Sequence, residues 1–478
     1  MTLFSILLAT ALSVSHDSAN ISKKVCWFDT PKAVTAECYQ LRVPESKTQK
    51  ISTILSLPVV VLTDSETDEK LAPVVLPSIG PLYGLGLGEE HIAKALAGFS
   101  SNEFGNRKHI YIDTRGTGLA KPIPNCPEEE AYSTQDRMDF GNCIKEISAG
   151  GSDVYEYRAE RAADDIVALS EAMKLPRFHV IAYGQETKAI QILARNNPNL
   201  IKSAIFLNPE PERYPTLEYT AESWAIAVQR VVQLCRHSTI CSQKYQNIFE
   251  GDIDKSIDDI SLDPLTFEGE PASYFLQNEF NGYDIATHIY LGFENAEMVK
   301  HVPVLLSLAL AGNGQQYADY VYGLYQEIDW SQYDYGIGEA TTSIATYCQD
   351  RYWVNDKRQM GKQGPYFLKD IEANALKNYE YYCENVFKKP SHSFAPDAID
   401  DYNFLAVYGD LSAYVSPASY SFFAKPSRGQ RIVVKNVNED LFESECTEKW
   451  MTEYMDMIDA GMMPPIKLSP CEPKVIDF

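Results

Sequence analysis

The sequence predicts an α/β fold: a mainly parallel sheet flanked by helices and interrupted by a large helical insertion. Short apolar strands alternate with amphipathic helices up to about residue 210. The alternation stops between 211 and 400 and returns from 401 to 478. Strands that alternate with helices favour parallel pairing, because a parallel connection has to cross a face of the sheet. We expect residues 16–210 and 401–478 to form the core, and residues 211–400 to form a helical cap.

The elements of the core follow from local patterns. Apolar residues recur three or four positions apart between 156 and 173, which indicates an amphipathic helix. Strands are expected at the β-branched or apolar runs 51–63, 71–76, 109–112, 177–182, 202–207, 403–407 and 431–435. Other core helices are expected at 89–97, from 189, at 418–424 and at 441–458. A sheet that is interrupted by a helical block and then completed is the plan of an α/β-hydrolase with a cap.

The N-terminus predicts export. Residues 3–14 form an apolar run that is too short to span a bilayer and ends in small residues. We interpret residues 1–15 as a signal peptide, although no Lys or Arg precedes the run; the alternative is a buried N-terminal strand. No other stretch approaches ~18 uninterrupted apolar residues, so no stable membrane anchor is expected. The predicted location is secreted or periplasmic.

The composition limits the kinds of molecule that this protein is expected to bind. The net charge of −24 disfavours nucleic acid and anionic membranes, which repel an acidic surface. Ten cysteines in an exported chain favour disulfides, but the sequence leaves their connectivity open. No Cys-x-x-Cys or His-rich spacing indicates a metal, and we expect no cofactor. One glycosylation-type triplet, Asn20-Ile21-Ser22, by itself decides nothing.

One loop carries a specific resemblance. Asp113-Thr114-Arg115-Gly116-Thr117-Gly118 follows a predicted strand. It is similar to the D-Q-R-G-T-G-x-S-x-P loop of the secreted proline iminopeptidases and tripeptidyl aminopeptidase-like serine exopeptidases, and departs from it at Thr114 and Ala120. The glycines permit a tight loop, and Arg115 can brace its neighbours by charge-assisted hydrogen bonds. The resemblance extends over residues 26–478.

This resemblance implies an α/β-hydrolase fold and a disulfide pattern. The implied pairs are Cys26 with Cys38, Cys126 with Cys143, Cys235 with Cys241, Cys348 with Cys383, and Cys446 with Cys471.

The catalytic positions of the family do not match. In the nucleophile elbow G-x-S-x-G, we align Gly184-Gln185-Glu186-Thr187-Lys188, which places Glu186 at the serine. The acid of the G-x-x-D-x-x-T-P loop aligns with Ser412, with Asp410 near but out of place. The histidine aligns with Glu439, and no histidine lies between residue 410 and the C-terminus. The oxyanion loop H-G-G-P-G corresponds to residues 78–82, including Ile79, Gly80 and Pro81, where Ile79 and Leu82 replace glycines.

These replacements support three hypotheses. The first is a non-catalytic protein with a binding or scaffold role, because acyl transfer needs a nucleophile, a base and an orienting acid. The second is an active exopeptidase or esterase with a relocated nucleophile and base, which requires a hydroxyl and a histidine within about 3 Å under the cap. Glu186 as a nucleophile would still lack a histidine to activate water.

The third hypothesis is a pocket for a peptide or amine ligand, with a protein as the other possible partner. Glu186 and Glu439 would face the old site, with Lys188 as their positive partner. Asp350 resembles the position at which the family places an acid to hold the free amine of a substrate.

Overall fold

The structure is a computed structural model. It describes residues 20–49, 52–78, 87–88, 96, 104–126, 137–275, 277–293, 297–327, 340–356, 358–359, 379–387, 389, 402–423, 428–438, 441–472, 476 and 478. The predicted signal peptide at 1–15 lies outside these residues, and so does the expected helix at 89–97 apart from Leu96.

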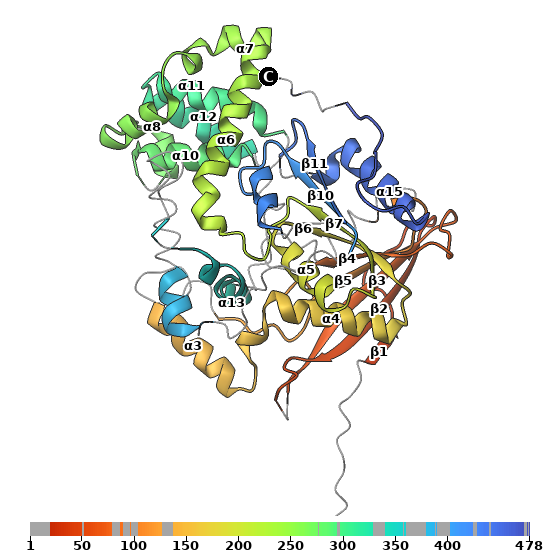
Figure 1. The fold of residues 1–478 in the computed structure, drawn as a ribbon. Helices are drawn as coiled ribbons and strands as arrows, with labels where there is room; N and C mark the ends of the chain where they lie inside the picture. The colour runs from red at the N-terminus through yellow and green to blue at the C-terminus, as the bar shows by residue number, and fades with distance from the viewer. Residues whose placement is uncertain are drawn as a thin grey trace, which may run out of the picture.

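In the described part of the chain, one nine-stranded sheet forms the centre of the molecule (Figure 1). Its order is β1-β2-β3-β5-β4-β6-β7-β10-β11. The strands are β1 (Asn20–Lys24), β2 (Thr35–Pro44), β3 (Ile54–Thr63), β4 (Val74–Ser78), β5 (His109–Asp113), β6 (Phe178–Tyr183), β7 (Ile201–Leu207), β10 (Phe404–Gly409) and β11 (Gly429–Val434). The strands from β5 to β11 in this order are parallel, whereas β1, β2 and β3 pair antiparallel.

The strand order identifies the fold. Counted from β2, the third and fourth strands of the chain exchange places in the sheet, and only β3 runs against the others. The strand β10 pairs with β7, so the sheet resumes after an insertion of almost 200 residues. This is the α/β-hydrolase fold. The addition to it is β1, which extends the antiparallel edge.

Helices cover both faces of the sheet, as the apolar strands require. On one face lie α4 (Ala159–Met173) and α5 (Thr187–Asn196), whose buried residues join the largest core cluster. On the other face lies α15 (Glu445–Asp459), which packs through residues such as Met451 and Tyr454 (Figure 1). Strands such as β4, with five buried residues in succession, can therefore be apolar on both sides.

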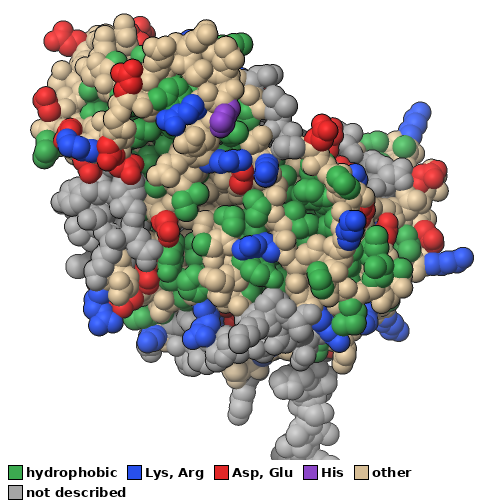
Figure 2. All heavy atoms as spheres, turned by 45° about the horizontal axis from the view of Figure 1, so that its top comes forward, with side chains coloured by type: hydrophobic (Ala, Val, Ile, Leu, Met, Phe, Trp, Pro, Cys, Tyr) green, Lys and Arg blue, Asp and Glu red, His purple; other side chains and the backbone are tan. Residues whose placement is uncertain are grey.

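The insertion forms two helical units with separate cores. The larger one surrounds Trp224 and Tyr317 and stands above the sheet in Figure 1. It contains α6 (Thr216–His237), α7 (Thr239–Lys244), α8 (Ile253–Leu262), α9 (Glu270–Tyr274), α10 (Gly282–Leu291), α11 (Val302–Leu310), α12 (Gly314–Glu327) and the short strands β8 (Leu265–Thr266) and β9 (Glu279–Phe280). Acidic side chains lie over this unit in Figure 2, and α8 alone carries Asp254, Asp258 and Asp259.

The smaller unit joins parts that are far apart in the sequence. Helix α13 (Ala340–Asp350) and the π-helical turn η9 (Tyr382–Val386) pack with α3 (Arg137–Ala149), which precedes the elbow. Two disulfides lie in this core, Cys126–Cys143 and Cys348–Cys383. The other three are Cys26–Cys38, Cys235–Cys241 and Cys446–Cys471, so the pairing is the one that the family resemblance implies.

The structure differs locally from the sequence prediction at two places. The segment expected as a helix at 418–424 is a 3-10 helix at Pro417–Phe422, where Pro417 begins the turn and Ser416 caps it. The sequence did not predict β2, because its polar residues obscure the alternation. The pairing of β2 with all ten residues of β3 compensates for this weak local signal.

Candidate functional site

The elbow between β6 and α5 is present, but its strained residue is Gly184. The chain leaves Tyr183 and forms a 3-10 turn, Gly184–Glu186, before α5 begins. Gly184 has φ +50°, whereas Glu186 has the ordinary helical φ of −59°. A nucleophile elbow carries its nucleophile on the sharp, strained strand-to-helix turn. By backbone geometry this position is Gly184, two residues before the Glu186 predicted from the sequence.

The physical reason for this correction is that the helical turns begin directly after the strand, at Gly184. The sequence alignment took Gly184 as the first glycine of the motif, which would place the strained residue inside the first turn of the helix. A β-carbon on Gly184 would meet no atom within 4 Å, so the space above the turn is open. Glu186 is buried, and its carboxylate accepts from the Tyr183 backbone N–H at 3.5 Å. It therefore caps its own turn.

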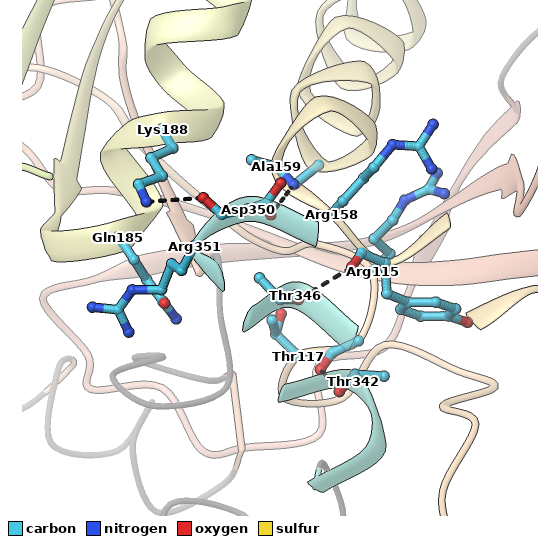
Figure 3. A pocket seen from close by; sticks show the side chains of 13 residues that line it. Arg115, Thr117, Arg158, Ala159, Gln185, Lys188, Thr342, Thr346, Asp350 and Arg351 are labelled. Carbon is cyan, nitrogen blue, oxygen red and sulfur yellow. Dashed lines mark hydrogen bonds between the residues drawn. The ribbon is translucent and has the colours of Figure 1, made fainter. Parts of the chain in front are cut away.

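Lys188 reaches the space beside the elbow and pairs with a glutamate. The side chain of Lys188 is only 2% exposed, and its Nζ lies 3.2 Å from Glu210 Oε2. It also donates to the Asp350 carbonyl at 3.1 Å (Figure 3). Glu210 follows the end of β7 at the same edge of the sheet. The predicted pairing of Lys188 with Glu186 and Glu439 is not what the described residues show: its carboxylate partner is Glu210.

Arg351 completes this cluster from the end of α13. Its Nε donates to Glu210 Oε2 at 3.1 Å, and its Nη2 donates to Oε1. Burial by itself raises the pKa of Glu210, but Arg351 and Lys188 outweigh it and hold that pKa below its usual value. Burial lowers the pKa of Lys188, while the charge of Glu210 opposes the change. One buried carboxylate is thus held between two cations.

Asp350 is bound within the chain. Its carboxylate accepts from the Ala159 N–H at 2.7 Å, at the start of α4 (Figure 3). Anions are favoured at a helix N-terminus by its unpaired N–H groups. Burial nevertheless raises the pKa of Asp350 to about 7, with the Ala159 hydrogen bond and Lys188 opposing the shift. The carboxyl group of Asp350, which lines the crevice, therefore gains or loses its proton near neutral pH.

The cavity that the described residues form beside Lys188 is small. Its volume is about 30 Å³, room for one or two water molecules and not for a peptide. The residues that line it are Arg115, Gly116, Thr117, Tyr157, Arg158, Ala159, Ala162, Gln185, Lys188, Thr342, Thr346, Asp350 and Arg351. No histidine is among them. Each lining threonine donates a hydrogen bond to a backbone carbonyl: Thr117 to Ser78, Thr342 to Gly116 and Thr346 to Tyr157.

The loop that carries the family resemblance braces this crevice. Arg115 donates to both carboxylate oxygens of Asp165, at 2.9 and 2.7 Å, and also to the Glu45 carbonyl at 2.6 Å. Asp113 accepts from the Leu87 and Leu119 N–H groups, and burial raises its pKa to about 7.

Both glycines of this loop have a positive φ. A β-carbon on Gly118 would lie 2.2 Å from Asp113, and one on Gly116 would lie 2.8 Å from Tyr157. This loop is therefore a structural brace.

Of the other aligned catalytic positions, Ser412 lies among the described residues. The hydroxyl of Ser412 accepts from the Val415 N–H at 3.1 Å within its own turn. Nearby Asp410 pairs with Arg230 at 3.0 Å and accepts from the Asn436 N–H at 2.6 Å. The remaining aligned positions, Ile79, Gly80, Pro81 and Glu439, lie outside the described residues.

Hydroxyl–histidine pairs exist, but at other places. His179 Nδ1 lies 2.8 Å from Ser203 Oγ, and His179 Nε2 lies 3.1 Å from Asp459 Oδ1. This Ser-His-Asp group is at the opposite end of the sheet from the elbow, where β6 and β7 begin. Three further pairs are described: His288 with Tyr317 and His301 with Tyr320 lie in the larger helical unit, and His109 with Tyr111, at 3.5 Å, lies on β5. None of these residues lines the cavity, so the relocated pair expected under the cap is not found among the described residues.

Over the described ranges, no group of three or more His, Cys, Asp or Glu side chains could hold a metal ion. Within the same ranges, no helix is both long and apolar enough to cross a membrane.

Comparisons with known proteins are consistent with these observations but add little. No family model and no curated protein matches the chain. Among solved structures, proline iminopeptidase from Mycobacterium smegmatis is 12% identical over 88% of this chain and 99% of that chain, with a TM-score of 0.38. A proline iminopeptidase-related protein from Thermus thermophilus is 12% identical over 89% and 99%, with a TM-score of 0.35. A haloalkane dehalogenase variant from Bradyrhizobium elkanii is 13% identical over 90% and 98%, with a TM-score of 0.34.

Similarity at this level carries no argument about activity. The fold assignment therefore rests on the strand order of the sheet.

The sequence did not reveal Gly184, Glu210 and Arg351 as site residues. A signal for Glu210 existed, because it stands just after a predicted strand, and ligands of open α/β sheets lie at the carboxyl ends of strands. Arg351 gave no such signal.

Proposed function

We propose that this chain is an exported, non-catalytic α/β-hydrolase-fold protein with a binding or scaffold role, derived from secreted exopeptidases of the proline iminopeptidase type. The observation that carries the proposal is the elbow itself. Gly184 occupies the strained position without a hydroxyl, and Lys188 fills the adjoining crevice in a buried pair with Glu210.

The cavity that the described residues form beside this pair is too small for a peptide. A peptide or amine that paired with Glu210 would have to displace Lys188, which also donates to the Asp350 carbonyl. Breaking a buried ion pair by withdrawing one partner typically costs about 3–5 kcal/mol. The same displacement would be needed by an exopeptidase or an amine-binding protein, so this argument weighs against both alternatives.

Export is supported by the disulfides. Structural disulfides persist in oxidising compartments and are rare in the cytosol. All ten cysteines are paired, with Cα–Cα separations of 4.9–6.0 Å that suit a disulfide.

The test uses the purified chain with aminoacyl and tripeptidyl p-nitroanilides, p-nitrophenyl esters and a fluorophosphonate probe. We expect rates equal to those of a buffer control and no covalent labelling, with an active serine hydrolase run in parallel. Saturable turnover by the purified chain would overturn the proposal.

A Gly184→Ser variant provides the matched comparison, because it places a hydroxyl at the strained position. We expect it to remain inactive, since no histidine lines the cavity. The serine has open space but a left-handed backbone, so unfolding should become easier by about 1–2 kcal/mol, measured by urea denaturation.

A further inference from the structure

The two edges of the sheet are treated differently. At one edge, the β11 residue Gln430 exchanges two hydrogen bonds with the main chain of Ile466, at 2.8 and 2.6 Å. The side chain of Gln430 therefore holds the C-terminal tail beside that edge. At the other edge, β1 pairs with β2 on its inner side, and the described residues supply no backbone partner for its outer side (Figure 1). An uncovered edge strand is a template for pairing with another chain.

The outer strand β1 carries the glycosylation-type triplet Asn20-Ile21-Ser22. Asn20 and Ser22 are both exposed, and Ile21 between them packs against the core cluster that contains α4. Side chains two apart in a strand point to the same side, so the amide and the hydroxyl share a face. The residue opposite Asn20 is Arg42, which is also exposed, so a bulky group on Asn20 would meet no packed side chain there.

A disulfide lies at the end of the same strand. Lys24 is opposite Cys38 in the register, and Cys38 is bonded to Cys26 two residues after β1 ends. The eukaryotic compartment that forms such bonds also transfers glycans to Asn-x-Ser/Thr.

We propose that Asn20 carries an N-linked glycan that shields the open edge formed by β1. In the transfer, the Asn20 amide nitrogen forms a bond to C1 of the first sugar of a lipid-diphosphate-linked oligosaccharide. The bond from C1 to the phosphate oxygen breaks, the amide loses one proton, and the lipid diphosphate leaves. The inference rests on the export proposed above, but not on the loss of catalysis.

The experiment tests glycosylation of Asn20 separately from export. The full chain is expressed in a eukaryotic secretory host, once with its own residues 1–15 and once with a host leader in their place. We expect a mass increase that peptide-N-glycosidase removes, with Asn20 converted to Asp. The Asn20→Gln and Ser22→Ala variants should lose it, and Ser22→Thr should keep it. A chain secreted behind the host leader without sugar overturns the glycan, whereas failure of the native leader alone counts only against export.

The shielding role has its own readout. After enzymatic deglycosylation, the oligomer fraction at high concentration should rise severalfold by light scattering. A Lys24→Pro substitution, which blocks edge pairing, should reverse the rise. An unchanged oligomer fraction would overturn the shielding role.

Discussion

The two ends of the sheet divide the features of a hydrolase site between them. The carboxyl end has the turn geometry, and the amino end has side chains of the types that form a catalytic triad. At the carboxyl end, the elbow has its strained turn at Gly184 and a cap above it, but Lys188, Glu210 and Arg351 occupy the crevice. At the amino end, Ser203, His179 and Asp459 have the hydrogen-bond order of a catalytic triad. Ser203 at that end lies fully buried within β7, beside a register shift between β6 and β7, and not on a strained turn.

The electrostatics at the amino end determine which nitrogen of His179 carries the proton. His179 and Lys202 hold the pKa of Asp459 well below its usual value even though burial raises it, and burial lowers the pKa of His179. An ionised Asp459 can only accept, so His179 Nε2 carries the proton and Nδ1 accepts from Ser203. This orientation would suit a general base. The difference between the two ends teaches that a triad requires access and an oxyanion site as well as suitable side chains.

The largest expected effect is at the carboxyl end. Glu210→Ala should lower the free energy of unfolding by about 3–5 kcal/mol, because it leaves Lys188 and Arg351 buried without their carboxylate. Urea denaturation followed by tryptophan fluorescence measures the change. The control is the exposed Glu268→Ala, which should stay within about 0.5 kcal/mol. A loss for Glu210→Ala as small as that of the control would mean that the cluster does not hold the crevice closed.

Asp350, at the same end of the sheet, is expected to make the stability of the native state depend on pH. Its pKa rises from 3.8 to about 7 on folding, so the unfolded chain releases its proton first and the native state loses stability as pH rises from about 4 to 7. Asp350→Asn removes this term while keeping an acceptor for Ala159. It should therefore stabilise the protein more at pH 8 than at pH 5, by about 2 kcal/mol. Thermal and urea unfolding at both pH values would measure it, with the exposed Asp263→Asn as control; equal effects at the two pH values would contradict the assignment.

The smallest effect is expected at the amino end. Ser203→Ala should lower the free energy of unfolding by about 1 kcal/mol, because His179 Nδ1 loses its donor in the core. Hydrolysis and fluorophosphonate labelling should not change. The exposed Ser273→Ala serves as control for stability. If Ser203→Ala abolished a measurable activity, the amino end would be the functional one and the comparison would be reversed.

Much of the fold was predictable because it follows from local patterns of residues along the sequence. Strands β6 and β7, helix α4 and the return of the sheet at β10 follow from runs of apolar residues with periods of two or 3.6. The tight Asp113–Gly118 loop was also recognisable, since its glycines adopt a positive φ that other residues avoid.

The site was predictable only in part. The sequence located an elbow between β6 and α5 but placed its strained residue at Glu186, because the helix was expected from 189 whereas α5 begins at Thr187. The partners of Lys188 were missed, because Glu210 belongs to another strand and Arg351 lies 141 residues beyond Glu210.

The sequence by itself determined the alternation of strands and helices, the absence of histidine after residue 410, and a cysteine set suited to disulfides. Only the tertiary structure decided that Gly184 is the strained residue and that Lys188 is buried between Glu210 and Asp350. It also decided that a triad-like group stands at the wrong end of the sheet. The reason is physical: backbone strain and buried charge pairs depend on which distant segments meet in space, and periodicity along the chain does not encode those meetings.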